Sequence, residues 1–117
     1  VTDLRDARWA LQPETSSLRH TIETMFRNVG LPPPIPLCES AGGPHEMMRL
    51  AQWLEVLVCV PRIAVAKEIA QGELCVLQVP GMAPPAFSLC FVNLQENDDF
   101  EPLRRLRNAA RVVMQGD

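Results

Sequence analysis

Apolar residues recur with helical spacing along three stretches of the chain. In the first stretch, five apolar residues at positions i, i+4, i+7, i+8 and i+11 form one helix face: Leu18, Ile22, Met25, Phe26 and Val29. Ser16 or Ser17 can cap the start of this helix, because a hydroxyl oxygen accepts an unpaired N–H of the first turn. Gly30 can take the left-handed conformation that ends it.

Two longer helices and one short helix follow. The second helix begins near Pro44, which suits a first helical position. Its expected buried residues are Met47, Leu50, Ala51 and Leu54. A short helix over residues 63–71 ends at Gly72, and a final helix spans residues 100–113 after a polar turn at 95–99. The expected buried residues of the final helix are Leu103, Leu106, Ala110 and Val113.

Short apolar runs between these helices predict strands. They cover residues 9–11, 35–39, 56–60, 74–79 and 87–92. Residues 56–60 are apolar on both faces, which is typical of a central strand covered on both sides. The order β-α-β-α-β-α-β-β-α predicts the α/β class, with a largely parallel sheet flanked by helices and right-handed crossovers.

Composition narrows the class of protein further. With 117 residues and 47% hydrophobic residues, the chain is long enough for one globular domain at most. Its longest aliphatic run is far shorter than the roughly 20 residues of a membrane-spanning helix. A net charge of −3 without a Lys/Arg stripe counts against direct binding of nucleic acid. The polar start at Val1 resembles no signal peptide, so we expect an excised piece of a longer cytoplasmic protein.

The residues that could carry chemistry form no recognisable catalytic set, and we expect no enzyme and no cofactor. His20 is expected on a solvated helix face, and His45 in the first turn of the second helix. Four cysteines lie far apart in the sequence without the close pairs that zinc needs: Cys38, Cys59, Cys75 and Cys90. We therefore expect no metal site and interpret the cysteines as buried, reduced thiols.

The predicted topology indicates where a ligand would bind. In an open parallel sheet, ligands bind beyond the carboxyl ends of the strands. Loops 12–17, 40–45 and 61–63 meet that description, and the first two lead into helix starts that favour an anion. The candidate hydrogen-bond donors are Ser16, Ser17, Ser40 and the backbone of Gly42 and Gly43. Plain helix capping and turn formation explain the same residues without a ligand.

Residues 50–65 resemble a segment of the LysR-type transcriptional regulators. Their sequence LAQWLEVLVCVPRIAV is similar to the family pattern L-V-x-x-G-x-G-I-x-x-x-P-x-x-A-V. Residues 68–77 match the continuation E-L-x-x-G-x-L-V-x-L, and residues 26–31 resemble F-x-x-x-G-x. The ordered series covers nearly the whole chain. It departs from the family at Leu54 and Val56, where the family has glycine, so the helix must end there in another way.

The resemblance implies a periplasmic-binding-protein-like lobe from an effector-binding domain. Residues 1–85 would form the second lobe, and residues 86–117 the strand and helix that return to the first. An anionic small-molecule effector would lodge between the lobes of a cytoplasmic homo-oligomer, with Pro61 shaping the rim of the cleft. DNA would be bound only by a helix-turn-helix domain absent from this chain, and no membrane would be involved.

Two other functions remain open at this point. The first is a module for self-association, because removal of the first lobe would expose the apolar residues 87–92 and the final helix. The second is an enzyme or transport protein built on the same two-lobed fold, since a fold alone does not decide function. Loss of turnover on replacing His45 or Cys38 would support an enzyme.

Overall fold

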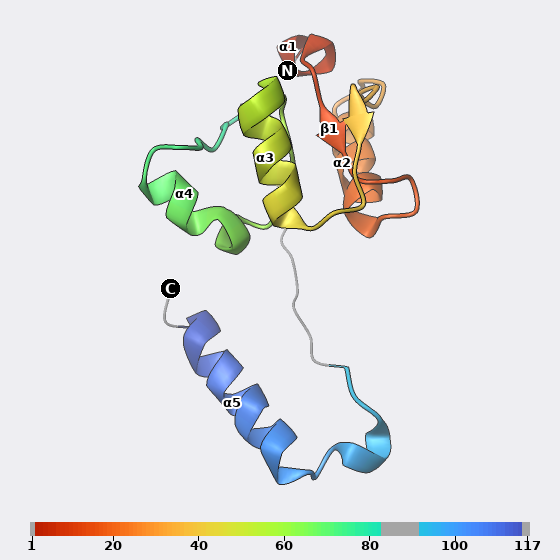
Figure 1. Ribbon diagram of the computed structural model, residues 1–117. Helices are drawn as coiled ribbons and strands as arrows, with labels where there is room; N and C mark the ends of the chain where they lie inside the picture. Colours follow the sequence, from red (N-terminus) through yellow and green to blue (C-terminus); the bar gives the residue numbers. More distant parts are fainter. Residues whose placement is uncertain (1, 83–91, 116–117) are drawn as a thin grey trace. The chain divides into compact units, whose positions relative to one another are not determined.

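The computed structural model of the chain describes residues 2–82 and 92–115 (Figure 1). The chain divides into two compact units, residues 1–86 and 87–117. The first unit contains α1 (Thr2–Asp6), α2 (Ser17–Asn28) and α3 (Pro44–Leu54), with a small parallel sheet. The α/β character expected from the sequence is therefore present, with helices more extensive than strands.

The sheet is centred on β1 (Ala10–Leu11). On one side β1 pairs in parallel with β2 (Cys38–Glu39), with Ala10 opposite Cys38. On the other side Trp9 forms a parallel bridge with Leu57, and the Ala10 N–H donates to the Leu57 carbonyl at 3.0 Å. Within the described residues the order is thus β2, β1, then residues 56–60. Among the described residues β1 is the central strand, so the prediction that residues 56–60 are central is wrong for the part of the sheet that the structure describes.

The two faces of the sheet are covered by different helices. Trp9 and Leu11 pack with Ile22 and Phe26 of α2, whereas Ala10 between them packs with Met47 of α3. This division follows from the period of two in a strand, in which neighbouring side chains point to opposite faces. Each helix therefore buries its apolar face against its own side of the sheet.

Residues 56–60 alternate in the same way, although they form only one bridge. Leu57 and Cys59 pack on the α2 side, and Val58 and Val60 pack on the α3 side. The prediction of a segment covered on both faces is therefore confirmed. Its position at the edge could not be read from hydrophobicity, because burial on both faces does not determine the order of strands.

The ends of α2 are as the sequence predicts. The Ser16 hydroxyl accepts a hydrogen bond from the Leu18 N–H at 3.2 Å, and Gly30 has φ of 76°. The end of α3 is different from the family pattern. Neither Leu54 nor Val56 adopts positive φ; instead Glu55 between them turns the chain with φ of 52° and ψ of 48°. A side chain with a Cβ is strained in this left-handed conformation.

We expect the substitution Glu55→Gly to raise the free energy of unfolding by about 0.5–1 kcal/mol, because relief of the Cβ clash exceeds the extra chain entropy of glycine. Glu55→Ala is the matched control: it removes the same carboxylate but keeps the Cβ. Urea unfolding followed by circular dichroism measures both variants. Equal stabilisation by alanine and glycine would show that the charge, and not the backbone, is responsible.

The segment after residue 60 is only partly as expected. The short helix is present as a 3-10 turn, η1 (Arg62–Val65), followed by α4 (Ala66–Ala70) and by Gly72 with φ of 77°. Residues 74–79 form no strand, and Val76 and Leu77 are exposed. A strand needs a hydrogen-bonding neighbour, and no described strand runs beside this segment. The predicted strand 87–92 lies outside the described residues except for Val92, which is exposed.

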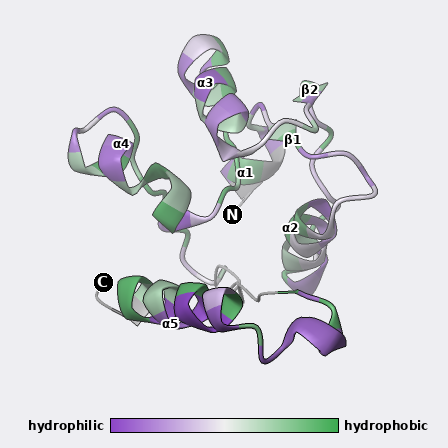
Figure 2. Cartoon of the chain, turned by 60° about the horizontal axis from the view of Figure 1, so that its bottom comes forward, coloured by the Kyte–Doolittle hydropathy of each residue, from purple (hydrophilic) through white to green (hydrophobic). Residues whose placement is uncertain are grey.

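The second unit consists of η2 (Gln95–Asn97) and α5 (Glu101–Gln115). The predicted final helix is confirmed, but its apolar face is largely uncovered: Leu106 is 54% exposed and Val113 is 68% exposed. Leu103 and Ala110 are half-buried. Figure 2 shows hydrophobic and hydrophilic residues on different sides of α5. The expected burial of Leu106 and Val113 is therefore wrong for the described residues.

The described helices contain no stretch with the length and hydrophobicity needed to cross a bilayer.

Candidate functional site

Three loops leave the sheet at one edge. Because β1, β2 and residues 56–60 run parallel, loops 12–17, 40–45 and 61–63 all start at carboxyl ends of strands. Hydrogen bonds join them where they start. The Ser40 N–H donates to the Leu11 carbonyl at 3.0 Å, and the Gln12 side-chain amide donates to the Cys59 carbonyl at 2.9 Å. The structure thus brings together the three loops that the sequence predicts to line a site.

Loops 12–17 and 40–45 follow two neighbouring strands but lead to opposite faces of the sheet. The chain leaving β1 enters α2 on one face of the sheet, and the chain leaving β2 enters α3 on the other face. Adjacent strands whose connections go to opposite faces leave a crevice between them, and ligands of open α/β sheets bind there. The candidate site is therefore the region beyond the ends of β1 and β2, to which we refer as the crevice.

The predicted donors have structural roles at this crevice. Ser16 is half-buried and caps α2, whereas Ser17 is exposed in the first turn. Ser40 is buried, and its hydroxyl oxygen accepts the Gly42 N–H at 3.0 Å. Both capped hydroxyls keep their own proton, which a ligand can accept. Capping and ligand binding are therefore compatible for these serines.

The other two predicted residues flank the same edge. Gly43 is exposed and is the N-cap residue of α3, with no side-chain cap. A Cβ built on Gly43 meets nothing within 4 Å, so the space beside it is open. Pro61 is half-buried and precedes η1, beyond the segment that bridges Trp9.

Arg19 connects the ends of β1 and β2 and is not among the predicted site residues. Its side chain is buried, with the residue 6% exposed. Its Nε donates to Glu23 Oε1 at 2.8 Å, and its Nη1 donates to the Gln12 carbonyl at 2.9 Å and to Glu39 Oε1 at 3.0 Å. One guanidinium therefore ties the first turn of α2 to the end of β1 and to the last residue of β2.

The contacts of Arg19 determine its charge. Desolvation by burial lowers the pKa of the guanidinium, but the hydrogen bonds to Glu39 and Glu23 and the charges of these two carboxylates together outweigh it, so the net pKa is raised above its ordinary value. Arg19 is therefore cationic at any pH at which the protein is handled. The burial of Arg19 could have been inferred from its spacing in the sequence. Arg19 lies three residues before Ile22 and seven before Phe26, on the face of α2 that packs against the sheet.

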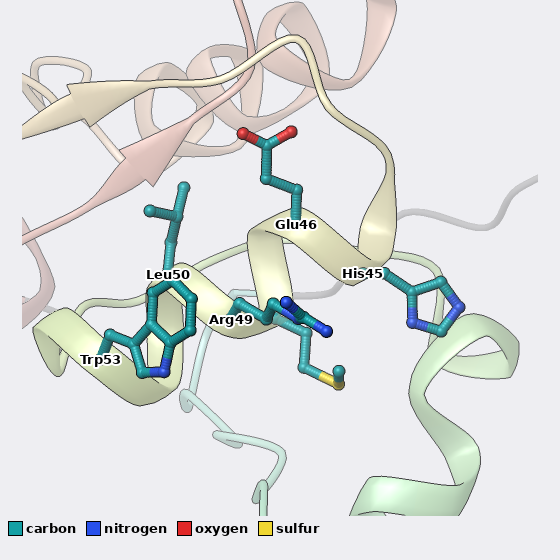
Figure 3. A pocket seen from close by; sticks show the side chains of 6 residues that line it. His45, Glu46, Arg49, Leu50 and Trp53 are labelled. Atoms are coloured by element: carbon teal, nitrogen blue, oxygen red, sulfur yellow. The ribbon is translucent and has the colours of Figure 1, made fainter.

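A carboxylate lies at the start of α3. The Glu46 side chain folds back over Gly42 and fills the position that a Cβ on Gly42 would occupy. Figure 3 shows Glu46 pointing away from the axis of α3, on a different side from His45. Glu46 also borders a shallow depression of about 460 Å³ along α3, where Arg49 lies over the exposed Trp53 ring at 5.9 Å.

The cysteines differ from one another in exposure. Cys38 and Cys59 are half-buried free thiols, and burial raises the pKa of Cys59, so its reactive thiolate form is disfavoured. Cys75 is exposed, so the prediction of buried thiols is wrong for that residue. Its segment, 74–79, makes no strand that would cover it. Cys90 lies outside the described residues.

These features define the class of the protein: an α/β unit with a small parallel sheet and a candidate ligand site at the carboxyl ends of its strands. The family model of the LysR substrate binding domain matches residues 1–115, and the chain belongs to this family. The family has a periplasmic-binding-protein-like α/β fold and is one of regulator domains, not of enzymes.

One curated relative supports the same assignment. Over 41 residues the chain is 54% identical to the HTH-type transcriptional regulator GbpR of Azospirillum brasilense. The match covers 35% of this chain and 12% of that regulator. No solved structure matches the chain.

Proposed function

We propose that this chain is the effector-sensing part of a LysR-type transcriptional regulator and that a small molecule binds at the crevice beyond β1 and β2. The observation that carries the proposal is the convergence of three loops on one sheet edge, joined by the Gln12 and Arg19 hydrogen bonds. Family membership supports the sensing role. The location of the site is supported by the connections that follow β1 and β2, because these go to opposite faces of the sheet.

In this proposal residues 1–85 are the second lobe of a two-lobed domain, and residues 86–117 return to the first lobe. The effector would favour one arrangement of the lobes through its differential affinity for the two arrangements. Homo-oligomeric regulators would transmit that shift to their DNA. Whether the effector is anionic, as the sequence suggests, depends on which charged groups already lie at the starts of α2 and α3.

Self-association is the second candidate, and the exposed apolar face of α5 favours it. Phe100, Leu106 and Val113 are all more than half exposed, which is typical of a surface that packs against another element. Size-exclusion chromatography with light scattering separates the two candidates. A monomer at all concentrations would exclude self-association and leave effector sensing intact.

The test of effector sensing is a thermal unfolding screen of the protein against a metabolite library. A ligand that binds only the folded state raises the midpoint temperature in a saturable way. Gly43→Val is the blocking variant, because a Cβ at this position projects into open space at the start of α3. Gln78→Val, on the exposed segment after α4, is the matched control.

We expect at least one metabolite to stabilise the wild type and the Gln78→Val control, and its affinity to fall at least tenfold in Gly43→Val. A screen in which no compound gives a saturable shift, or in which Gly43→Val binds as tightly as the wild type, would refute the proposed site.

A further inference from the structure

A stretch with four prolines between α2 and β2 has no role in the proposed site, and its most prominent side chain is uncovered. Ile35, within this stretch, is 90% exposed. We infer that residues 32–37, the proline strip, dock on Trp53 and Arg49 of a second copy of the chain, and that the two copies exchange this contact reciprocally. The inference goes beyond effector sensing and uses none of the residues predicted for the crevice.

The sequence of the proline strip restricts its backbone. Proline holds φ at about −65°, and the residue before a proline is driven to an extended conformation. Pro32, Pro33 and Ile35 each precede a proline, and residues 32–36 belong to no helix or strand. These conditions describe a polyproline II segment, which has about three residues per turn, so that Pro32 and Ile35 lie on the same edge.

The residues of the proline strip differ in exposure. Pro34 is buried, which anchors the strip to the rest of the first unit. Pro32 and Ile35, which share an edge, are both exposed, and Leu37 is 56% exposed. An apolar edge on a preordered backbone binds a partner at little cost in conformational entropy, so the strip is suited to recognition by another surface.

The backbone of the proline strip offers mainly hydrogen-bond acceptors. Among residues 32–36 only Ile35 has an N–H, because the others are prolines. None of the five carbonyls accepts a hydrogen bond from a described backbone group, and the chain pairs again at Leu37, whose N–H donates to the Trp9 carbonyl at 2.7 Å. The missing N–H groups also prevent this segment from pairing with a further strand. A partner must therefore supply an apolar surface together with donors.

The face of α3 around Trp53 has the complementary chemistry. The Trp53 side chain is 72% exposed, and the Arg49 guanidinium lies over its ring at 5.9 Å from the centroid (Figure 3). Apart from this contact, neither the indole N–H nor the guanidinium is paired with a described residue. This face therefore combines an aromatic ring with unpaired donors, and tryptophan and arginine are enriched among the residues that contribute most to binding at protein interfaces.

A second copy of the chain supplies both complementary surfaces. The proline strip and α3 belong to the same unit and are both uncovered in it, so one chain does not cover its own strip. Each copy carries a strip and an α3 face, so a two-fold axis produces two identical contacts in one dimer. Each contact brings the positive charge of Arg49 to carbonyl oxygens of a strip that contains no cation, which makes the surfaces complementary in charge as well.

The experiment combines analytical ultracentrifugation of the full chain with a peptide titration. The variants are Ile35→Asp in the strip, Trp53→Ser on α3, and the control Val76→Asp, which places the same charge at another exposed apolar residue. The peptide probe is a synthetic copy of residues 31–37, LPPPIPL, with blocked ends. Its binding is followed by tryptophan fluorescence, and Trp53→Ser is the blank for this titration.

We expect the wild type and Val76→Asp to form dimers, and the dissociation constant of the dimer to rise at least tenfold in Ile35→Asp and in Trp53→Ser. An equal mixture of these two variants should associate more tightly than either variant alone, because the mixed dimer keeps one intact contact. The peptide should shift the Trp53 emission to the blue in a saturable way. A wild type that is monomeric at every concentration, or one that gives no saturable response to the peptide, would overturn the inference, and both of these measurements depend on no variant.

The outcomes separate this inference from effector sensing. Dimers that are unaffected by both Ile35→Asp and Trp53→Ser would overturn the inference and assign self-association to another surface, such as the apolar face of α5. Stabilisation by a metabolite that Gly43→Val abolishes supports effector sensing whether or not the chain forms dimers through the proline strip.

Discussion

Replacing Arg19 by alanine is expected to lower the free energy of unfolding by about 2–3 kcal/mol, because it removes the donor of Glu39 and of the Gln12 carbonyl and leaves Glu23 with the exposed Arg27 as its partner. The cost stays at the low end for a buried pair because the Glu23 and Glu39 side chains are 20% and 46% exposed and keep part of their hydration. Urea unfolding followed by circular dichroism measures the loss. The slope of the free energy of unfolding against urea concentration should be unchanged.

Arg27 provides a matched control on the same helix. Its Nη2 pairs with Glu23 Oε2 at 3.2 Å, but its side chain is 54% exposed. Exposed pairs of this kind contribute little, so Arg27→Ala should cost less than about 0.5 kcal/mol. Arg19→Lys should fall between the two, because one ammonium cannot reproduce the fork that reaches both carboxylates and the Gln12 carbonyl. Equal losses for Arg19→Ala and Arg27→Ala would show that burial does not strengthen the pairing.

Replacing Phe26 by alanine should have the largest effect on stability, a loss of about 3–5 kcal/mol in the free energy of unfolding. Phe26 is 1% exposed, and its ring packs edge-to-face with Trp9 at a centroid distance of 5.9 Å. The substitution removes this contact and leaves a cavity between α2 and the sheet. Denaturant unfolding of the purified variant measures the change.

Phe100→Ala is the control, because it makes the same side-chain change at an exposed position. Phe100 is 58% exposed in the second unit, so Phe100→Ala should change the free energy of unfolding by less than about 1 kcal/mol. A small effect at Phe26 would mean that α2 does not pack on the sheet as described.

Helices α2, α3 and α5 were predictable because their signals are local, whereas the short helix α1 was not expected. The apolar spacing of α2, the cap at Ser16 and the proline at the start of α3 each depend on residues within a few positions of one another. The strands were less predictable, since an apolar run becomes a strand only if a neighbour supplies hydrogen bonds. Residues 56–60 have such a neighbour in Trp9, whereas residues 74–79 have none among the described residues.

The convergence of the candidate loops on one edge was predictable, but the contacts of the charged side chains there were not. Parallel order alone brings loops 12–17 and 40–45 to one edge, as predicted. Two charged residues at this edge were missed for different reasons. Arg19 was not selected, because arginine is seldom buried unless it is paired, and its partner Glu39 lies 20 residues away. The fold of the Glu46 side chain over Gly42 depends on a rotamer that no spacing rule specifies.

The two tryptophans give the protein separate optical reporters of its interior and its surface. Trp9 is 8% exposed and its indole N–H donates to the Leu4 carbonyl at 2.9 Å, whereas Trp53 is 72% exposed on α3. With no tyrosine in the chain, intrinsic fluorescence comes from these two indoles. Iodide quenches an exposed indole far more than a buried one, so the quenched fraction reports events along α3. The residual blue-shifted emission reports the packing of α2 on the sheet in the same sample.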